Sequence, residues 1–560
     1  MISADLGRPR PAARAPSELS PVPAFPLPRS LVELVDRLAE RPEAGLTVYD
    51  RRGRNEVARP YPEVAARARA RAAWLAASGV RPGELVYLCL NTSHELIETF
   101  LGAALLGAVP CCLALPRAIG GLEVFRRRLG LLERFGANHL VTTADVAAEA
   151  GRAALVVPDE PDLAAVPPAP PAPAPGELAY VQLTSGSTQT PKAVAISHAN
   201  LAANAHGIVA RGAGHADETY VSWLPLYHDM GLVGMTFTAL YHGVGLALMP
   251  PEAFLGTPRR WLEAIAAQPT TVVTTAPNFG YQWCVDRVPA DKVAGLDLSR
   301  WRLACCGAEM VRPATLDDFA ARFAPAGFDR AAFLPCYGLA EATLAATMCP
   351  ARRPTVVRDG LVSCGPPLEG LEVSVRAPED GRPLDDGAEG EVCLRGTSVF
   401  LGYFLDEDAT AAARRDGWFR TGDLGYLRDG ELYVTGRVKD LLVLDGANVA
   451  PHELEWLAQD LIDLDGGRAA AFSVEHARRE VPVLVVEVRE APGPEVTDAL
   501  RGRAAHDVAP LFDLVFVRRG TLPKTSSGKV QRSAVRARYL EGALEGVLWR
   551  LRPTPDGGTT

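Results

Sequence analysis

The sequence predicts an α/β protein in which a sandwich of largely parallel sheets precedes a β-barrel-like subdomain and a smaller α+β unit. Helix and strand patterns alternate up to about residue 365, and short strands joined by Asp-Gly turns follow. A new mixture of helices and strands begins near Lys439. The chain of 560 residues is also too long for one ordinary hydrophobic core, so two or more domains are expected.

The alternation begins in the N-terminal part. Residues 61–79 have a helix pattern that ends at Gly79, and residues 84–90 form an apolar run typical of a buried strand. Residues 92–107 predict a second helix capped by Thr92 or Ser93, and residues 138–143 predict another strand.

A Pro- and Ala-rich stretch at residues 166–176 has two interpretations, an interdomain linker or a surface loop. We favour the loop, because strand patterns resume unchanged after it at residues 221–226, 271–277 and 301–309. The alternating α/β part therefore continues through this stretch.

The pattern of predicted elements changes after Gly365. Residues 371–404 and 417–437 contain short strands with Asp-Gly turns, as in a barrel-like subdomain. In the last part, residues 451–461 predict a helix with Pro451 in its first turn, and residues 530–544 predict a closing helix. The apolar runs at 481–490 and 513–519 predict the strands of this unit.

Composition excludes several classes of function. The formal net charge is -9 and no Lys/Arg-rich block occurs, which argues against nucleic-acid binding. No apolar stretch is long enough to span a membrane, and residues 1–30 do not have the pattern of a signal peptide, so a cytoplasmic protein is expected. The ten cysteines include no CxxC pair, and we expect buried, reduced thiols and no zinc site.

The stretch at residues 180–201, YVQLTSGSTQTPKAVAISHANL, joins a predicted strand to a loop rich in Gly and hydroxyl residues. Successive backbone N–H groups and hydroxyls in such a loop can wrap an anion, and a nearby lysine adds charge. The loop lacks the Gly-Lys-Ser/Thr ending of a Walker-type loop, and an ordinary Ser/Thr/Gly turn is the alternative interpretation. The residues concerned are Thr184, Ser185, Gly186, Ser187, Thr188 and Lys192.

Other candidate residues follow or interrupt apolar runs. His228 and Asp229 lie between two such runs, where His228 is either a satisfied core residue or a donor facing a carboxylate. Tyr337 could stack on a planar ring. Glu341 could hold Mg²⁺, which prefers one or two carboxylates together with phosphate oxygens. A solvated loop carboxylate is the alternative for Glu341.

Three further segments carry polar side chains suited to a nucleotide. Asp423 offers an acceptor for vicinal ribose hydroxyls, and Arg437 can join it. Lys439 follows closely, and Lys524 and Lys529 lie on a Gly-containing loop near the C-terminus. Such a loop lysine is either simply solvated or a mobile cation that reaches a site on another domain.

Taken together and in order, these segments resemble the adenylate-forming superfamily of acyl-CoA synthetases, nonribosomal adenylation domains and luciferases. The resemblance covers nearly the whole chain after the first thirty residues. The segments SWLPLYHDMGLVG, TTAPNFGYQWCVDRV, CCGAEMVRP, PCYGLAEATL and VSCGPPLEG are most similar to those of fatty acyl-AMP ligases.

The resemblance implies a domain organisation. It gives a flexible arm at residues 1–30 and a large domain at 31–438, made of two stacked α/β sheet subdomains and the barrel-like subdomain. A small mobile α+β domain at 439–548 and a tail at 549–560 complete the chain.

The resemblance also implies a reaction and a role for each candidate. ATP and a carboxylic, fatty-type acid would form acyl-AMP with release of pyrophosphate. The acyl group would then pass to the phosphopantetheine thiol of an acyl carrier protein of a polyketide or peptide synthase. The TSGST loop and Lys192 would grip the β,γ-phosphates, and the adenine site would be formed by Gly307, Ala308, Glu309, Tyr337 and Gly338.

The remaining roles concern the metal, the ribose and the acid. Glu341 and Thr188 would coordinate Mg²⁺, Asp423 and Arg437 would bind the ribose, and Lys529 would bridge the carboxylate and the α-phosphate. The small domain would rotate about Lys439. His228 would lie near the carboxylate, with an acyl tunnel lined by Gly234, Asn278 and Phe279.

Some residues depart from the family pattern. Gln189 and Ala193 replace usual glycines beside the phosphate loop, and Ala340 replaces a threonine common in the wider superfamily. The segment 342–362 is short for the insertion typical of acyl-AMP ligases, and DGANVAPHELE at 445–455 is more similar to CoA ligases. Transfer to CoA therefore stands as the alternative, with an idle adenylate-binding protein as a third hypothesis.

Overall fold

The fold is known from a computed structural model of the chain. It describes residues 28–116, 121–136, 138–165, 173–184, 192–444, 447–462, 464, 466–476, 479–524 and 529–551. Most of the expected arm at residues 1–30 therefore lies outside the described residues. Its last residue, Ser30, caps helix α1 (Leu31–Ala39) by accepting a hydrogen bond from the backbone N–H of Glu33.

The largest sheet has eight strands in the order β14-β13-β12-β11-β9-β10-β1-β2. Its six inner strands are parallel, and β2 and β14 close the two edges in the antiparallel sense. The bounds are β1 (Gly45–Tyr49), β2 (Glu56–Pro60), β9 (Glu218–Ser222), β10 (Gly245–Leu248), β11 (Thr271–Pro277), β12 (Trp301–Gly307), β13 (Phe333–Gly338) and β14 (Ala345–Met348).

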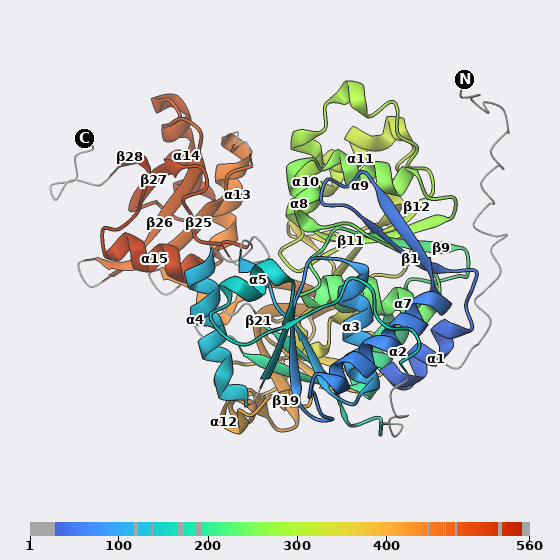
Figure 1. The fold of residues 1–560 in the computed structure, drawn as a ribbon. Coiled ribbons are helices and arrows are strands. Elements are labelled where there is room, and N and C mark those ends of the chain that lie inside the picture. Colours follow the sequence, from blue (N-terminus) through green and yellow to red (C-terminus); the bar gives the residue numbers. More distant parts are fainter. Residues whose placement is uncertain are drawn as a thin grey trace.

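Helices cover both faces of this sheet (Figure 1). On one face, Trp301 of β12 packs edge-on against Trp261 and Phe319, which belong to two of the covering helices. The helices of this side are α8 (Pro251–Gly256), α9 (Arg259–Ala266), α10 (Asn278–Arg287) and α11 (Pro313–Phe323). The other side carries α6 (His198–Arg211), the π-helical segment η4 (Met230–Phe237) and α7 (Thr238–His242).

A second, smaller sheet stacks on the first through a shared helical layer. It has the order β4-β3-β5-β6, all parallel. Helix α3 (His94–Leu105) is buried along almost its whole length, as expected of a helix between two sheets, and Ser93 is its N-cap. The other elements are α2 (Tyr61–Ala77), β3 (Leu85–Cys89), β4 (Val109–Cys112), α4 (Leu122–Leu132), β5 (Asn138–Thr142), α5 (Ala144–Glu149) and β6 (Leu155–Val156).

Two antiparallel units follow the stacked sheets. A three-stranded unit pairs β7 (Leu178–Leu183) and β8 (Ala193–Ser197) with the distant β19 (Gly402–Tyr403). The barrel-like unit contains β17 (Leu371–Arg376), β18 (Gly390–Gly396), β20 (Arg414–Arg415), β21 (Trp418–Arg428) and β22 (Glu431–Arg437), with α12 (Glu407–Ala412) beside it and the small pair β15 (Val357–Arg358) and β16 (Leu361–Val362) before it.

The predicted Asp-Gly turns are present in this unit. Asp429 and Gly430 join β21 to β22, and both have positive φ, at 54° and 77°. This is the backbone that a two-residue hairpin requires at both central positions, and glycine and aspartate tolerate it. The mixed α/β class with a barrel-like subdomain is therefore confirmed.

The C-terminal unit has its own four-stranded sheet in the order β25-β26-β27-β28. Successive residues of β26 and β27 point to opposite faces, and each face carries a separate hydrophobic core. The elements are β23 (Leu442–Leu444), β24 (Ala447–Val449), α13 (Pro451–Leu461), β25 (Ala469–His476), β26 (Arg479–Val488), α14 (Pro494–Asp507), β27 (Asp513–Arg518), α15 (Arg532–Leu540) and β28 (Val547–Leu551).

Strand β28 pairs with β27, so the sheet extends into the segment 549–560 that was expected to be a tail. The domain boundary near Lys439 and the mobility of the C-terminal unit stay predictions. Among the described residues, no helix is long and apolar enough to cross a membrane.

Candidate active site

A cavity of about 1780 Å³ lies where the carboxyl ends of the large sheet, the barrel-like unit and the C-terminal unit meet. Ligands of open parallel sheets bind at this edge of the strands. The wall contains most of the predicted site residues that the structure describes: Thr184, Lys192, His228, Gly234, Asn278, Phe279, Ala308, Glu309, Tyr337, Gly338, Glu341, Asp423, Arg437, Lys439 and Lys529. The structure therefore brings together segments from widely separated parts of the sequence, while their individual roles stay predictions.

The hairpin of β7 and β8 holds the predicted phosphate loop at its tip. The backbone N–H of Thr184 donates to the carbonyl oxygen of Lys192 at 2.9 Å and closes the base of the loop. Ser185, Gly186, Ser187, Thr188 and Gln189 lie outside the described residues. Ala193, which replaces a usual glycine, is buried at the start of β8.

The segment after β12 was expected to line an adenine site. Ala308 adopts a left-handed backbone with φ of 64°, and Glu309 accepts a hydrogen bond from the backbone N–H of Phe279 at 2.6 Å. Gly307 does not form part of the cavity wall. A Cβ atom there would lie 2.7 Å from the carbonyl oxygen of Cys336, so this glycine permits close packing of β12 on β13.

Tyr337, Asp423 and Arg437 form a hydrogen-bonded set on the wall. The Tyr337 hydroxyl donates to Asp423 Oδ2 at 2.7 Å, and Arg437 Nε lies 2.7 Å from Asp423 Oδ1. The Asp423 carboxylate raises the pKa of Arg437, and burial together with the same carboxylate raises the pKa of Tyr337 well above its usual value. The tyrosine is thus a neutral donor at physiological pH.

Glu341 lies in a short 3₁₀ turn at residues 340–342, with Ala340 buried beside it. The hydroxyl of Tyr403 donates to Glu341 Oε1 at 2.9 Å. Lys192 Nζ lies 4.2 Å from the centre of the Tyr403 ring, which is a cation–π contact. Burial raises the pKa of Glu341, and the nearby Lys192 opposes this rise.

Lys529 enters the cavity from the C-terminal unit. Burial is the main cause that lowers the pKa of Lys529, and the cation of Arg437 lowers it further. The carboxylates of Asp229, Glu309 and Asp423 act in the opposite direction. The lysine therefore lies among the carboxylates and the arginine of the large part of the chain.

Asp229, next to His228, was noted in the sequence but given no role. Its carboxylate accepts a hydrogen bond from the backbone N–H of Met230 at 2.7 Å, and burial raises its pKa while Lys529 lowers it. Tyr403 was not singled out at all. In the sequence, Tyr403 is marked only as an aromatic residue after Gly402. Its place near Glu341 depends on the pairing of β19 with β8, which the sequence does not predict.

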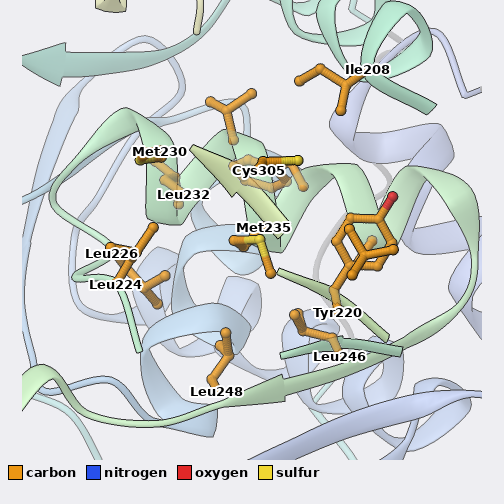
Figure 2. Close-up of a cluster of buried hydrophobic side chains, with 14 of the residues drawn as sticks. Ile208, Tyr220, Leu224, Leu226, Met230, Leu232, Met235, Leu246, Leu248 and Cys305 are labelled. Carbon is orange, nitrogen blue, oxygen red and sulfur yellow. The ribbon is translucent and has the colours of Figure 1, made fainter. Parts of the chain in front are cut away.

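The apolar part of the cavity is lined by η4, α6 and one face of the large sheet. Figure 2 shows Ile208, Tyr220, Met235 and Cys305 gathered with leucines of the same cluster. A Cβ atom at Gly234 would lie 2.7 Å from Leu344 Cδ2, so the glycine leaves room here.

Asn278 and Phe279 begin helix α10 and also form part of the wall. Asn278 Oδ1 accepts a hydrogen bond from the backbone N–H of Arg312 at 3.0 Å, so its side chain is held by the neighbouring segment. The Phe279 ring lies 5.0 Å below the Arg468 guanidinium of the C-terminal unit.

Further contacts join the C-terminal unit to the large part. Arg312 is ion-paired and hydrogen-bonded to Asp460, and the Arg519 guanidinium lies 5.7 Å from the ring of Trp283. Lys439 lies in the turn between the two parts, where burial lowers its pKa. The neighbouring Asp440 pairs with Arg532 at 3.2 Å. These contacts hold the unit that carries Lys529 over the cavity.

Among the described residues, no group of three His, Cys, Asp or Glu side chains forms a preformed metal site. The ten cysteines are free, and nine of them are buried. Any divalent ion here would need oxygen ligands from a bound phosphate in addition to protein carboxylates.

Comparisons with known proteins agree with this geometry. Residues 36–404 match the family described as AMP-binding enzyme. A Caulobacter vibrioides protein whose name contains the words acyl-CoA synthetase is 35% identical over 541 residues, which cover 89% of this chain and 93% of that protein. The medium-chain-fatty-acid–[acyl-carrier-protein] ligase JamA of Moorena producens is 37% identical over 422 residues, covering 68% of this chain and 71% of JamA.

A solved structure gives a similar result. It comes from a study of fatty acyl-adenylate ligases from E. coli and L. pneumophila, and it superimposes with a TM-score of 0.83 at 32% sequence identity. The match covers 93% of this chain and 98% of that one. The similarity therefore extends through both the large part and the C-terminal unit.

Proposed function

This chain belongs to the AMP-binding enzyme family, and from that membership we propose that it is an ATP-dependent acyl-AMP ligase for a fatty-type acid. The single observation that supports the reaction best is the position of Lys529. It reaches from the C-terminal unit into a cavity that also contains Lys192 and Arg437. Cations from three segments thus converge where two anionic substrates must meet.

In the first step, a carboxylate oxygen of the acid attacks the α-phosphorus of ATP. The bond from that phosphorus to the bridging β-phosphate oxygen breaks, and pyrophosphate leaves with the electron pair. Negative charge spreads over the phosphoryl oxygens in the transition state, so fixed cations and positioning supply most of the catalysis. We assign Lys529 to the α-phosphate and the carboxylate, and Lys192 to the departing phosphates.

The wall of the cavity offers a matching place for the nucleoside. Asp423 and Arg437 would bind the ribose hydroxyls as acceptor and donor, and the Tyr337 ring would lie against the adenine beside Ala308 and Glu309. The hydrogen bond from Tyr337 to Asp423 already fixes both side chains, so the pocket is preorganised.

Mg²⁺ is part of this proposal. The half-buried Glu341 carboxylate lines the cavity and would supply the hard oxygen ligand that Mg²⁺ prefers beside phosphates, with Thr188 as a second ligand by resemblance. Bound there, the ion would neutralise charge on the phosphates. Tyr403 would orient Glu341 through its hydrogen bond.

The acid would place its carboxylate near His228 and its tail in the apolar part of the cavity. Burial of each methylene contributes about 0.8 kcal/mol, so a medium or long tail supplies most of the affinity for the acid. Gly234 and Met235 belong to the apolar wall that such a tail would contact.

In the second step, the phosphopantetheine thiolate of an acyl carrier protein would attack the acyl carbon, and AMP would leave with the electrons of the broken C–O bond. Rotation of the C-terminal unit about Lys439 would withdraw Lys529 and admit the thiol. The similarity to JamA supports a carrier protein as the acceptor. A cytoplasmic location, where ATP is available, belongs to the same proposal.

CoA is the second candidate acceptor. The relative named for acyl-CoA synthetase covers nearly the whole chain, and the segment 342–362 contains only β14 and the small pair β15–β16. This segment is short for an insertion that hinders rotation and CoA use.

The two acceptors separate in one experiment. Purified enzyme is given ATP, Mg²⁺ and a panel of fatty acids, and pyrophosphate release is measured. Thioester is then measured with holo carrier protein and with CoA. Pyrophosphate release followed by carrier-protein loading supports the proposal, and comparable CoA thioester would move the assignment to an acyl-CoA ligase. Absence of pyrophosphate release with every acid would indicate a non-catalytic adenylate-binding protein.

A further inference from the structure

One face of the large sheet forms the floor of the apolar part of the cavity, and its side chains lie in ordered rows. Parallel pairing sets Tyr220 beside Val273 and Val273 beside Leu303. Two residues nearer the catalytic edge, Thr275 pairs with Cys305. All five side chains line the cavity, so a tail that enters at the catalytic edge runs along these strands toward their amino ends.

The far end of this path is polar. Glu218 lies two residues before Tyr220 and so projects from the same face of β9, and it pairs with Thr271 of β11. Arg302 lines the cavity at an irregularity in the pairing of β11 with β12, and it is ion-paired to Glu218. From Pro277 back to Thr271, six residues at ~3.3 Å each place this end roughly 20 Å from the catalytic edge.

Two histidines complete what we call the polar floor, which consists of Glu218, Arg302, His215 and His242. His215 Nε2 lies 3.3 Å from Glu218 Oε1, and His242 Nδ1 lies 3.5 Å from Glu218 Oε2. Gly214 lines the cavity directly in front of His242, because a Cβ atom there would lie 2.7 Å from His242 Cε1. Arg302 Nη1 also donates to the carbonyl oxygen of Gly212 at 2.8 Å.

The polar floor leaves hydrogen-bonding atoms unused. Within the described part of the chain, Glu218 Oε2, Arg302 Nε and both ring nitrogens of His242 are buried without a hydrogen-bond partner. The side chains of Glu218 and His242 are 0% and 2% exposed, so bulk water does not supply the missing bonds. Of these side chains only that of Arg302 lines the cavity, and Glu218 and His242 lie directly behind it. Buried polar groups in folded proteins are nearly always paired, which makes these atoms candidates for ligand contact.

The unused atoms indicate which group fits. Glu218 Oε2 is an acceptor and Arg302 Nε–H is a donor, and a hydroxyl is the small group that both donates and accepts. A second carboxylate would meet Glu218, and an ammonium would meet Arg302, so each would face a like charge. Burial raises the pKa of Glu218 to about 7, which is consistent with a site that takes a neutral group.

We propose that the cavity selects acids whose apolar tail ends in a hydroxyl, with Glu218 and Arg302 hydrogen-bonded to that terminal group. This inference rests on the proposed acyl-AMP ligase function and specifies its substrate class. The first half of the tail would contact the rows of Tyr220 and Cys305, which bind methylenes. The polar floor would form hydrogen bonds only with the terminal group of a tail that is long enough to reach it.

The test compares matched acids in the pyrophosphate-release assay. Each plain acid from decanoic to hexadecanoic is paired with its ω-hydroxy derivative, and ω-carboxy and ω-amino acids of the same lengths are included. We expect one chain length at which kcat/KM for the ω-hydroxy acid exceeds that of its plain partner by about tenfold or more, since sites that bind a substrate hydroxyl reject analogues that lack it. The ω-carboxy and ω-amino acids should be the poorest.

A double variant, Glu218→Met with Arg302→Met, removes both charges together. Replacement of a buried ion pair by apolar residues of similar volume is usually tolerated, whereas removal of one partner is not. The ratio of ω-hydroxy to plain acid should fall by about tenfold in this variant. The matched control is Asp513→Leu with Arg550→Met, which replaces another carboxylate–arginine pair in the same way, at a place where neither residue lines the cavity. It should leave the ratio unchanged.

The possible outcomes separate this inference from the proposed function. If plain acids release pyrophosphate and their ω-hydroxy partners are no better at any length, the substrate class proposed here is wrong and the ligase function stands. If Asp513→Leu with Arg550→Met lowers the ratio as much as the polar-floor variant does, the polar floor is structural and the inference fails. If no acid releases pyrophosphate, both fail.

Discussion

The large part of the chain and the C-terminal unit contribute to the same cavity in different ways. The large part supplies the fixed wall of the cavity: strand ends, the half-buried carboxylate of Glu341 and the hydrogen-bonded set of Tyr337, Asp423 and Arg437. The C-terminal unit has separate hydrophobic cores and contributes Lys529 on a loop. In the proposed mechanism, affinity for both substrates would come from the large part, whereas the unit that carries the lysine would set the order of the two steps.

The largest effect is expected from Lys529→Ala. Loss of one preorganised group that stabilises developing charge costs about 10² to 10³ in rate, so acyl-AMP formation should fall by that factor. Thioester formation from supplied acyl-adenylate should change little, because the proposed rotation would withdraw the lysine before that step. Pyrophosphate release and single-turnover thioester formation measure the two steps.

Lys524→Gln provides the control for this variant. Lys524 also lines the cavity, and its ammonium pairs with Glu487 at 3.0 Å, a bond that glutamine can retain. The rate of acyl-AMP formation by Lys524→Gln should stay within a few-fold of the native rate. Equal losses of both steps in Lys529→Ala would contradict the proposed division of labour.

Next in size is Asp423→Ala in the wall. It leaves Tyr337 and Arg437 without their shared partner, and removal of one member of a buried charged pair costs about 3–5 kcal/mol. Arg437 is half exposed, so solvent screening makes the loss smaller than for a fully buried pair. We expect KM for ATP to rise about tenfold to hundredfold. KM for the acid should change little. Glu372→Ala, which removes an exposed ion pair with Arg395 on the same sheet, should leave both constants unaltered.

A smaller effect is expected at the contact between the two parts. Arg312→Ala removes the ion pair with Asp460, whose side chain is 55% exposed, and ion pairs screened by solvent contribute about 0.2–1 kcal/mol, which corresponds to less than about a sixfold change. Weakening this contact should slow the first step and speed the second. The charge-reversed pair Arg312→Asp with Asp460→Arg should restore the native ratio of the two rates. If both steps change together, the contact is only structural.

The smallest effect concerns acid stability, to which both parts contribute a buried histidine. Burial lowers the pKa of His198 and of His452 to about 4, from an ordinary value near 6.5. The unfolded state therefore binds more protons, so the free energy of unfolding is largest above pH 6.5 and falls as the pH drops toward 4. Urea unfolding at several pH values should show a shallower decline in His198→Gln and in His452→Gln than in the native protein. An unchanged slope in both would show that other groups dominate.

Much of this arrangement follows from local sequence. Ser93 and Pro451 mark helix starts where predicted, and Asp429-Gly430 makes the expected hairpin turn. Some candidate site residues, such as Thr184 and Glu309, follow a predicted strand, and strand ends of parallel sheets share one edge. Only the resemblance to a known family could order them into one site.

The remainder depends on contacts distant in sequence. The pairing of β19 with β8 brings Tyr403 to Glu341, and the polar floor joins Glu218 to Arg302, which is 84 residues away. No periodicity in either segment signals the other. Gly307 shows the opposite case: its motif predicted a place in the adenine site, but in the structure it lies outside the cavity wall and packs against Cys336.

Strands β9, β11 and β12 each run from the polar floor at their first residues to the reaction centre at their last. In the two proposals made above, the reaction and the choice of acid belong to opposite ends of these strands, roughly 20 Å apart along β11. Substitutions at the starts of these strands can retune which acid is accepted while the nucleotide end keeps its shape. Related enzymes can therefore accept different acids while they catalyse the same reaction.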